Sequence, residues 1–97
     1  MIKSEIITII AQKTGISKSD VRLTVETLLQ SIVHAMAQGE KVHLRNFGSF
    51  LSKKRARKVA RNISHNTALI IAEHYVPIFK PSKTIIEIIK TSVKDHN

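Results

Sequence analysis

The stretch from Lys41 to Ala72 constrains this chain most, because its charge has one sign only. It holds eight basic residues and no Asp or Glu, so it carries almost all of the formal net charge of +9. Its densest part, residues 53–61, leads into the polar segment 62–67 and then into the β-prone run 68–72. A basic segment, a polar turn and a β-prone segment predict a long β-hairpin.

A two-stranded hairpin has no interior in which the six basic side chains of residues 53–61 could be buried. Soluble surfaces usually mix both signs of charge, whereas this one is single-signed. The pattern therefore predicts a polyanion along one face of the hairpin, and nucleic acid is the first candidate. The ordinary alternative, a solvated basic face, is the weaker interpretation.

Size and composition limit the remaining possibilities. The 97 residues suffice for one small domain, and an exposed hairpin leaves little chain for a core, so oligomerisation is expected. The absence of cysteine excludes disulfides and thiolate metal sites. Neither a membrane-spanning run nor a signal peptide is evident, which predicts a cytoplasmic protein without a membrane partner.

Residues 1–39 are expected to form two helices. Isoleucines recur in residues 3–13, and Gly15 is well placed as a helix stop. The segment 17–20 resembles a capping box, and behind it apolar residues recur at steps of three and four until Gly39. The short link between the two predicts a helical hairpin.

Three strands are expected around the arm, which we define as residues 53–75. Residues 42–45 alternate apolar and polar, and the segment 46–49 turns the chain into a strand that starts at Phe50. Residues 75–79 return as a strand in which Pro77 suits an edge.

The last helix is expected from Lys83 to about Lys90, opened by Pro81 and Ser82, with a polar tail over residues 91–97. Its isoleucines are expected nearly to encircle it, at positions 85, 86, 88 and 89. Such a helix needs cover on more than one side, which a second chain can supply.

Catalytic patterns are not found. The five histidines have no ligand spacing, the seven acids are not grouped, and no phosphate loop or nucleophile motif occurs. We therefore expect neither an enzyme nor a cofactor, metal or small-molecule substrate. Phe47, Phe50 and Phe79 could stack on bases, but their places in turns and strand starts favour a small core.

Alternation along a strand puts Lys53, Arg55 and Arg57 on one face if no bulge intervenes. Near helix starts, three further lysines are expected to bind flanking phosphates, with ordinary surface lysines as the alternative: Lys3, Lys80 and Lys83.

Three blocks, residues 39–50, 61–62 and 76–83, resemble in order and spacing the bacterial DNA-bending family of HU and integration host factor. The resemblance spans residues 3–90. It implies an α+β fold: an intertwined dimer with a helical-hairpin base, a three-stranded antiparallel sheet as a saddle, and protruding β-ribbon arms. It also implies one DNA-binding domain over 1–97, divided into a helical hairpin (1–39), the sheet with its arm (40–82) and a C-terminal helix and tail (83–97).

The resemblance adds DNA contacts at Arg45, Asn46, Lys58, Arg61 and Asn62. The family's arm-tip motif is Arg-Asn-Pro, and its proline wedges between base pairs. Ile63 stands at that position here, and isoleucine is also an apolar wedge.

Other family positions differ too. Glycine is common at the positions of Asn46, Asn66 and Ser82; asparagine tolerates the left-handed conformation, and serine can cap the helix. Acids common in the family's descending arm are replaced by Thr67, Ala68 and Ile70, which leaves this arm more positive and more apolar.

These observations predict a bacterial, nucleoid-associated architectural protein that bends and compacts double-stranded DNA through its minor groove. We expect a homodimer with little sequence specificity and a preference for bent, nicked or flexible DNA. The alternatives are one subunit of a sequence-preferring heterodimer like integration host factor, or a basic module that binds structured RNA.

Overall fold

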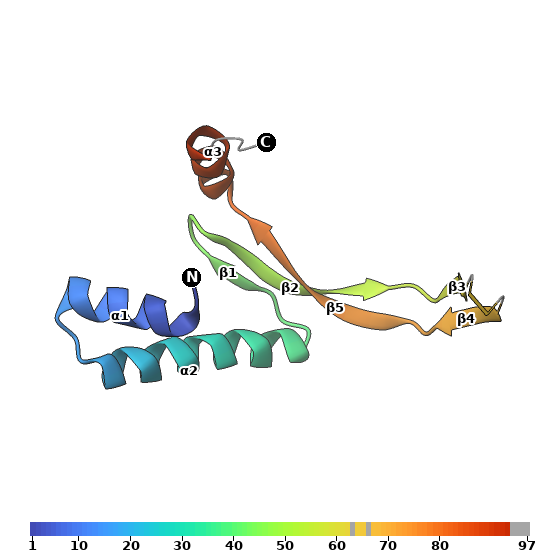
Figure 1. The fold of residues 1–97 in the computed structure, drawn as a ribbon, viewed down its shortest axis with the longest axis horizontal. Helices are drawn as coiled ribbons and strands as arrows, with labels where there is room; N and C mark the ends of the chain where they lie inside the picture. The colour runs from blue at the N-terminus through green and yellow to red at the C-terminus, as the bar shows by residue number, and fades with distance from the viewer. Residues whose placement is uncertain (63, 66, 94–97) are drawn as a thin grey trace. The chain divides into compact units, whose positions relative to one another are not determined.

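The computed structural model describes residues 1–62, 64–65 and 67–93 (Figure 1). Two compact units divide the chain, Met1–His34 and Ala35–Asn97, and each is considered by itself. Within the described residues the elements follow in this order: α1 (Lys3–Thr14), α2 (Lys18–Ala37), β1 (Val42–Leu44), β2 (Gly48–Arg55), β3 (Lys58–Asn62), β4 (Thr67–Ile71), β5 (His74–Pro81) and α3 (Lys83–Ser92).

Unit 1 holds α1 and most of α2, and local signals set the helix limits. α1 stops at Gly15, which takes a left-handed φ of 75° while its N–H donates to the Ala11 carbonyl at 2.9 Å. At the start of α2 the Asp20 N–H donates to the Ser17 hydroxyl at 3.2 Å, as a capping residue requires. Both predicted boundaries are confirmed.

The buried apolar side chains among the described residues are Ile7, Val21 and Ile32, and all three belong to unit 1. Ile7 is completely buried. The helical hairpin thus has a small apolar core of its own, whereas the described part of unit 2 buries no apolar side chain fully.

The sheet of unit 2 is antiparallel in the order β1-β2-β5, with β2 in the centre. Pro77 lies in β5, an edge strand, as predicted, because an edge tolerates a residue without an N–H. Asn46 turns the chain between β1 and β2 with a φ of 64°, which confirms the left-handed conformation expected there.

The three phenylalanines pack against one another beside this turn. Ring centroids are 4.8 Å apart for Phe50 and Phe79, 5.4 Å for Phe47 and Phe79, and 6.4 Å for Phe47 and Phe50. The rings thus contact one another, as the predicted core role requires, but they are not buried in the single chain. Phe47 and Phe79 remain 48% and 41% exposed.

The arm is a hairpin made of two successive ladders in one register. β2 pairs with β5 as far as Arg55 and His74, and β3 pairs with β4 from Lys58 and Ile71 onward. Two residues separate the ladders on each side, so the interruption inserts no extra residue into either strand. The predicted long hairpin is confirmed.

Ser82 joins α3 to the turn between β1 and β2. Its hydroxyl accepts from the Ile85 N–H at 3.2 Å and donates to the Asn46 carbonyl at 3.0 Å. Its own N–H donates to the Phe47 carbonyl at 2.9 Å. The predicted N-cap is confirmed, and the same residue fixes the turn.

The expectation that isoleucines encircle α3 is wrong. At 3.6 residues per turn, positions 85, 86, 88 and 89 span an arc of about 160°. Thr84, Glu87 and Lys90 occupy the opposite side of the helix. None of the ten residues of α3, all of them described, is buried. The helix therefore presents one apolar face that needs cover from one side.

Gly48 is required by close packing. A Cβ at this position would lie 2.5 Å from the Lys80 carbonyl oxygen and 2.6 Å from the Phe79 ring. We expect Gly48→Ala to lower the free energy of unfolding by about 1–3 kcal/mol, because an added methyl overpacks the site. Denaturant unfolding measures this, with Lys54→Ala in the same strand as the control. A Gly48→Ala chain as stable as that control would show that the site can relax.

Candidate nucleic-acid interface

The two faces of β2 carry basic residues that differ in whether an acid pairs with them. Lys53 and Arg55 alternate onto one face and are exposed. Lys54 points to the other face, where its Nζ lies 3.0 Å from Oε1 of Glu73. Glu73 is the only acid between residues 41 and 86. The one carboxylate of the arm thus pairs with the basic residue that lies off the predicted contact face.

Arg57 lies in the interruption between the ladders and belongs to no strand. Arg57 is predicted to share the face of Lys53 and Arg55 if no bulge intervenes. Both strands have two residues between the ladders, so no extra residue forms a bulge. Regular alternation stops at Arg55, however, so the face of Arg57 stays a prediction.

A hollow lies at this interruption, which we call the arm hollow. It is lined by Arg55, Ala56, Lys58, Ile71, His74 and Val76. Arg55 ends β2 and Lys58 begins β3, so the hollow brings basic residues from both ladders to one place. DNA contact at Lys58 stays a prediction.

The outer arm carries the remaining predicted contacts. Arg61 and Asn62 end β3, where they pair with Ala68 and Thr67 of β4. Ile63, the predicted wedge, lies outside the described residues, as does Asn66. Four apolar side chains of the outer ribbon are exposed: Val59, Leu69, Ile70 and Ile71.

A second basic group lies where the sheet meets α3. Arg45 and Asn46 follow β1, and Lys80, near the end of β5, pairs with Ser49. Lys83 is the first residue of α3, and the Ser82 bond to Asn46 holds the start of this helix at the turn. The free N–H groups and dipole of a helix N-terminus favour an anion at such a place.

Lys3 belongs to unit 1 and is not free in the isolated chain. Its Nζ lies 3.1 Å from Oε1 of Glu26, and the two side chains are 49% and 39% exposed. Exposed ion pairs of this kind contribute about 1 kcal/mol or less. A DNA phosphate could therefore replace Glu26 as the partner of Lys3 at little cost.

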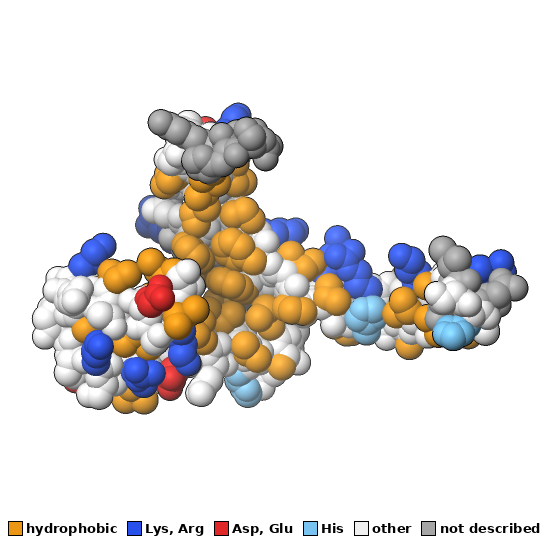
Figure 2. All heavy atoms as spheres, in the orientation of Figure 1, with side chains coloured by type: hydrophobic (Ala, Val, Ile, Leu, Met, Phe, Trp, Pro, Cys, Tyr) orange, Lys and Arg blue, Asp and Glu red, His pale blue; other side chains and the backbone are white. Residues whose placement is uncertain are grey.

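Figure 2 shows how these side chains are distributed on one face of the molecule. Lys and Arg side chains line the arm, and hydrophobic side chains gather over the sheet and run toward α3. Basic arm and apolar sheet are therefore distinct surfaces of unit 2, and they call for different partners.

Sequence reasoning missed two features of the arm. The Lys54–Glu73 pair depends on the register, because these residues are diagonal neighbours across the hairpin. His74, dismissed among five scattered histidines, pairs with Arg55 in the ladder, and its Nδ1 lies 2.8 Å from the Ala72 carbonyl oxygen. No local pattern signals either one.

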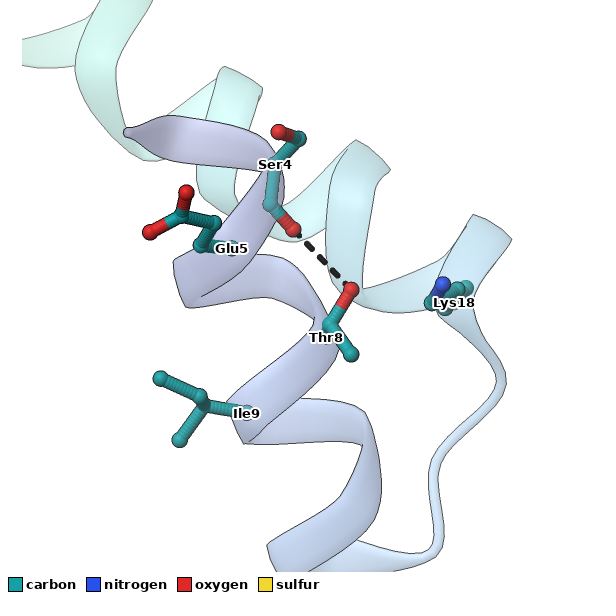
Figure 3. Close-up of a pocket in the computed structure, with 5 residues that line it drawn as sticks. All are labelled: Ser4, Glu5, Thr8, Ile9 and Lys18. Carbon is teal, nitrogen blue, oxygen red and sulfur yellow. Dashed lines mark hydrogen bonds between the residues drawn. The ribbon is translucent and has the colours of Figure 1, made fainter. Parts of the chain in front are cut away.

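A shallow hollow in unit 1 is lined by Ser4, Glu5, Thr8, Ile9 and Lys18, and its two charged side chains do not converge (Figure 3). Thr8 Oγ1 donates to the Ser4 carbonyl within its own helix at 3.1 Å. The described residues contain no group of three or more potential metal ligands and no helix long and apolar enough to cross a membrane.

Comparisons with known proteins give a consistent result. A family profile described as bacterial DNA-binding protein matches residues 1–90. DNA-binding protein HU of Thermotoga maritima is 41% identical over 90 residues, covering 93% of this chain and all of that protein. Integration host factor subunit beta of Hahella chejuensis is 38% identical over 95 residues, covering 97% of each chain.

Solved structures agree in fold. A cocrystal structure of Anabaena HU with DNA matches with a TM-score of 0.89 at 31% identity, covering 94% of this chain and 99% of that one. A mutant of Thermotoga maritima HU matches with a TM-score of 0.71 at 36% identity, covering 92% and 99%. The chain therefore belongs to the bacterial DNA-binding protein family of HU and integration host factor, whose members are non-enzymatic architectural DNA-binding proteins.

Proposed function

We propose that this chain, as a dimer, binds double-stranded DNA in the minor groove and bends it. The observation that carries the proposal is a two-stranded ribbon with exposed basic residues on both sides of the arm hollow and one carboxylate, itself paired, beside them. Anabaena HU, which shares this fold, was crystallised together with DNA, and this supports the same ligand here.

The proposed contacts fall into two sets. Along the arm, five basic side chains and the amide of Asn62 follow the phosphates of the groove: Lys53, Arg55, Arg57, Lys58, Arg61 and Asn62. Phosphates that flank the bend are held near helix starts and beside the turn after β1: Lys3, Arg45, Asn46, Lys80 and Lys83. Contacts of this kind position a duplex without reading its sequence. Preference for one DNA over another then comes from how easily it deforms.

Dimerisation follows from the unburied apolar surface of unit 2. The phenylalanine cluster is half exposed, and Ile88 and Ile89 of α3 are each 54% exposed. Full burial of one such side chain contributes about 1.5–3 kcal/mol. A second copy that covers these faces supplies a core that the described part of this unit lacks. The same surface would also suit a related subunit, as in integration host factor.

Residues 1–97 act in this proposal as one DNA-binding domain, within which the two compact units are parts. The arm, about residues 53–75, is its DNA-binding extension. Its place of action is the bacterial nucleoid in the cytoplasm.

A direct test compares binding to nicked duplex, intact duplex and structured RNA at one salt concentration. Preference for the nicked duplex supports bending, whereas preference for RNA contradicts the proposal.

Dimer formation should make stability depend on concentration, because folding and association then form one equilibrium. We expect the melting temperature to fall on dilution over about two decades of protein concentration. Sedimentation of the chain alone, with and without a short duplex, gives the mass of each species. A monomer mass with a constant melting temperature would contradict the dimer.

DNA affinity should be mostly electrostatic. If about eight to ten phosphates are neutralised per dimer, log K should fall with log salt at a slope of about −7 to −9. Lys53→Gln with Arg55→Gln removes four charges per dimer and should make the slope less steep by about 3–4. Fluorescence anisotropy over a salt series measures this.

The matched control removes the same charge outside the arm, with Lys13→Gln and Lys18→Gln, both exposed residues of unit 1. Neither residue is among the proposed contacts, so the slope should stay close to that of the parent chain. Equal changes in the two double variants would indicate a general effect of net charge and would exclude the proposed arm face.

Ile63 is proposed to be the wedge, on the strength of its position after Arg61 and Asn62. Ile63→Ala should reduce the bend angle and the preference for kinked DNA, because an apolar wedge offsets unstacking of a few kcal/mol. Its effect on the salt slope should be small, since no charge changes, and Ile63→Pro should preserve bending. End-to-end energy transfer on a short, doubly labelled duplex measures the bend.

The control for this series is Ile70→Ala, which removes the same side chain from β4, away from the segment between the strands. We expect this variant to bend DNA like the parent chain. If Ile63→Ala bends DNA as far as Ile70→Ala does, the wedge is another residue.

A further inference from the structure

We propose that His74 is a phosphate-contact residue of the arm and binds DNA in its protonated form. This inference rests on the proposed function and extends it to a residue that sequence patterns gave no reason to select. It starts from the arm hollow, whose lining includes Arg55, Lys58 and His74 together.

His74 faces the same side of the sheet as Arg55. The two residues are direct partners in the ladder between β2 and β5. Directly opposed side chains in an antiparallel pair lie on one face, with Cβ atoms about 4.5–5.5 Å apart. An anion bound by the guanidinium of Arg55 therefore lies within reach of the imidazole.

A hydrogen bond at the start of β5 determines which ring nitrogen of His74 carries the hydrogen in the neutral form. Nδ1 of His74 lies 2.8 Å from the carbonyl oxygen of Ala72. A carbonyl oxygen only accepts, so Nδ1 carries the hydrogen and donates. Nε2 is then the nitrogen left for an outside partner. It has no hydrogen in the neutral ring and donates only when the ring is protonated, so a phosphate oxygen requires the imidazolium.

DNA binding would add negative charge beside the ring. In the free chain the hollow holds Arg55 from β2 and Lys58 from β3, both positive, beside the apolar Ile71 of β4. Glu73 precedes the histidine but pairs with Lys54, and Tyr75 follows it with an exposed side chain. A phosphate in the hollow adds negative charge, so the complex favours the imidazolium more than the free chain does.

Proton uptake should therefore accompany DNA binding. By linkage, a complex that holds more protons than its free components becomes more stable as pH falls. Histidine is the side chain whose charge ordinarily changes between about pH 5 and 8, which places the effect in the physiological range.

The test measures affinity for a short nicked duplex at fixed salt from about pH 8 to about pH 5.5. We expect the parent dimer to bind about 2- to 30-fold more tightly at the lower pH, from two exposed charge pairs. Calorimetry in two buffers of different ionisation enthalpy should detect the proton uptake directly.

Two variants separate protonation from structure. His74→Asn keeps an amide donor near the position of Nδ1 but does not titrate. The DNA affinity of this variant should therefore lose the pH dependence that His74 causes, and binding should lose the proton uptake at this residue. His74→Lys is charged throughout the range and should also lose that dependence. His43→Asn, which removes an imidazole from β1 outside the arm, should retain the parent's pH dependence.

The outcomes distinguish this role from the proposed function. If the parent binds duplex without pH dependence, or if His74→Asn keeps the parent's dependence, His74 is not a protonated contact. If His74→Asn weakens binding equally at every pH, its role is structural and the proposal is wrong. A parent chain that binds no duplex overturns the proposed function, and this inference with it.

Discussion

Uncompensated positive charge on a ribbon without a core is the constraint on which the rest of the structure depends. The stretch from Lys41 to Ala72 supplies eight basic residues, and the acid that directly follows it, Glu73, is already paired with Lys54. Basic neighbours along a strand repel one another, and a two-stranded ribbon cannot bury them. Both conditions are relieved by one ligand, a polyanion that follows the ribbon, which is why a DNA-binding family fits this chain.

The continuous register of the two ladders keeps the basic side chains of β2 and β3 on one ribbon. Because two residues on each side separate the ladders, the interruption leaves every pairing beyond it in phase. It releases the chain from ladder geometry at Ala56 and Arg57, where Arg55 and Lys58 come to border one hollow. The Lys54–Glu73 pair spans part of this joint, and the His74 bond to Ala72 satisfies a carbonyl inside it.

The apolar side of the molecule complements the basic side. Gly48 lets β5 approach β2 so closely that a methyl group would not fit, and this approach seats Phe79 against Phe50. Ser82 then ties the start of α3 to the same turn. The phenylalanine cluster and the isoleucine face of α3 remain half open in one chain. Cover from a second chain would complete that core and at the same time provide a second arm.

Local signals in the sequence determined the helix limits, the hairpin and the basic character of the arm. Gly15, Ser17 and Ser82 act through bonds to residues a few positions away, so their roles can be predicted without a fold. The isoleucine positions of α3 also follow from the local sequence. A helix turns about 100° per residue, so these isoleucines lie on one face and do not encircle the helix as expected. Only the tertiary structure decided which residues meet across the hairpin. Lys54 with Glu73, and Arg55 with His74, follow from a register set by pairing between distant segments, and no periodicity within either segment specifies that register.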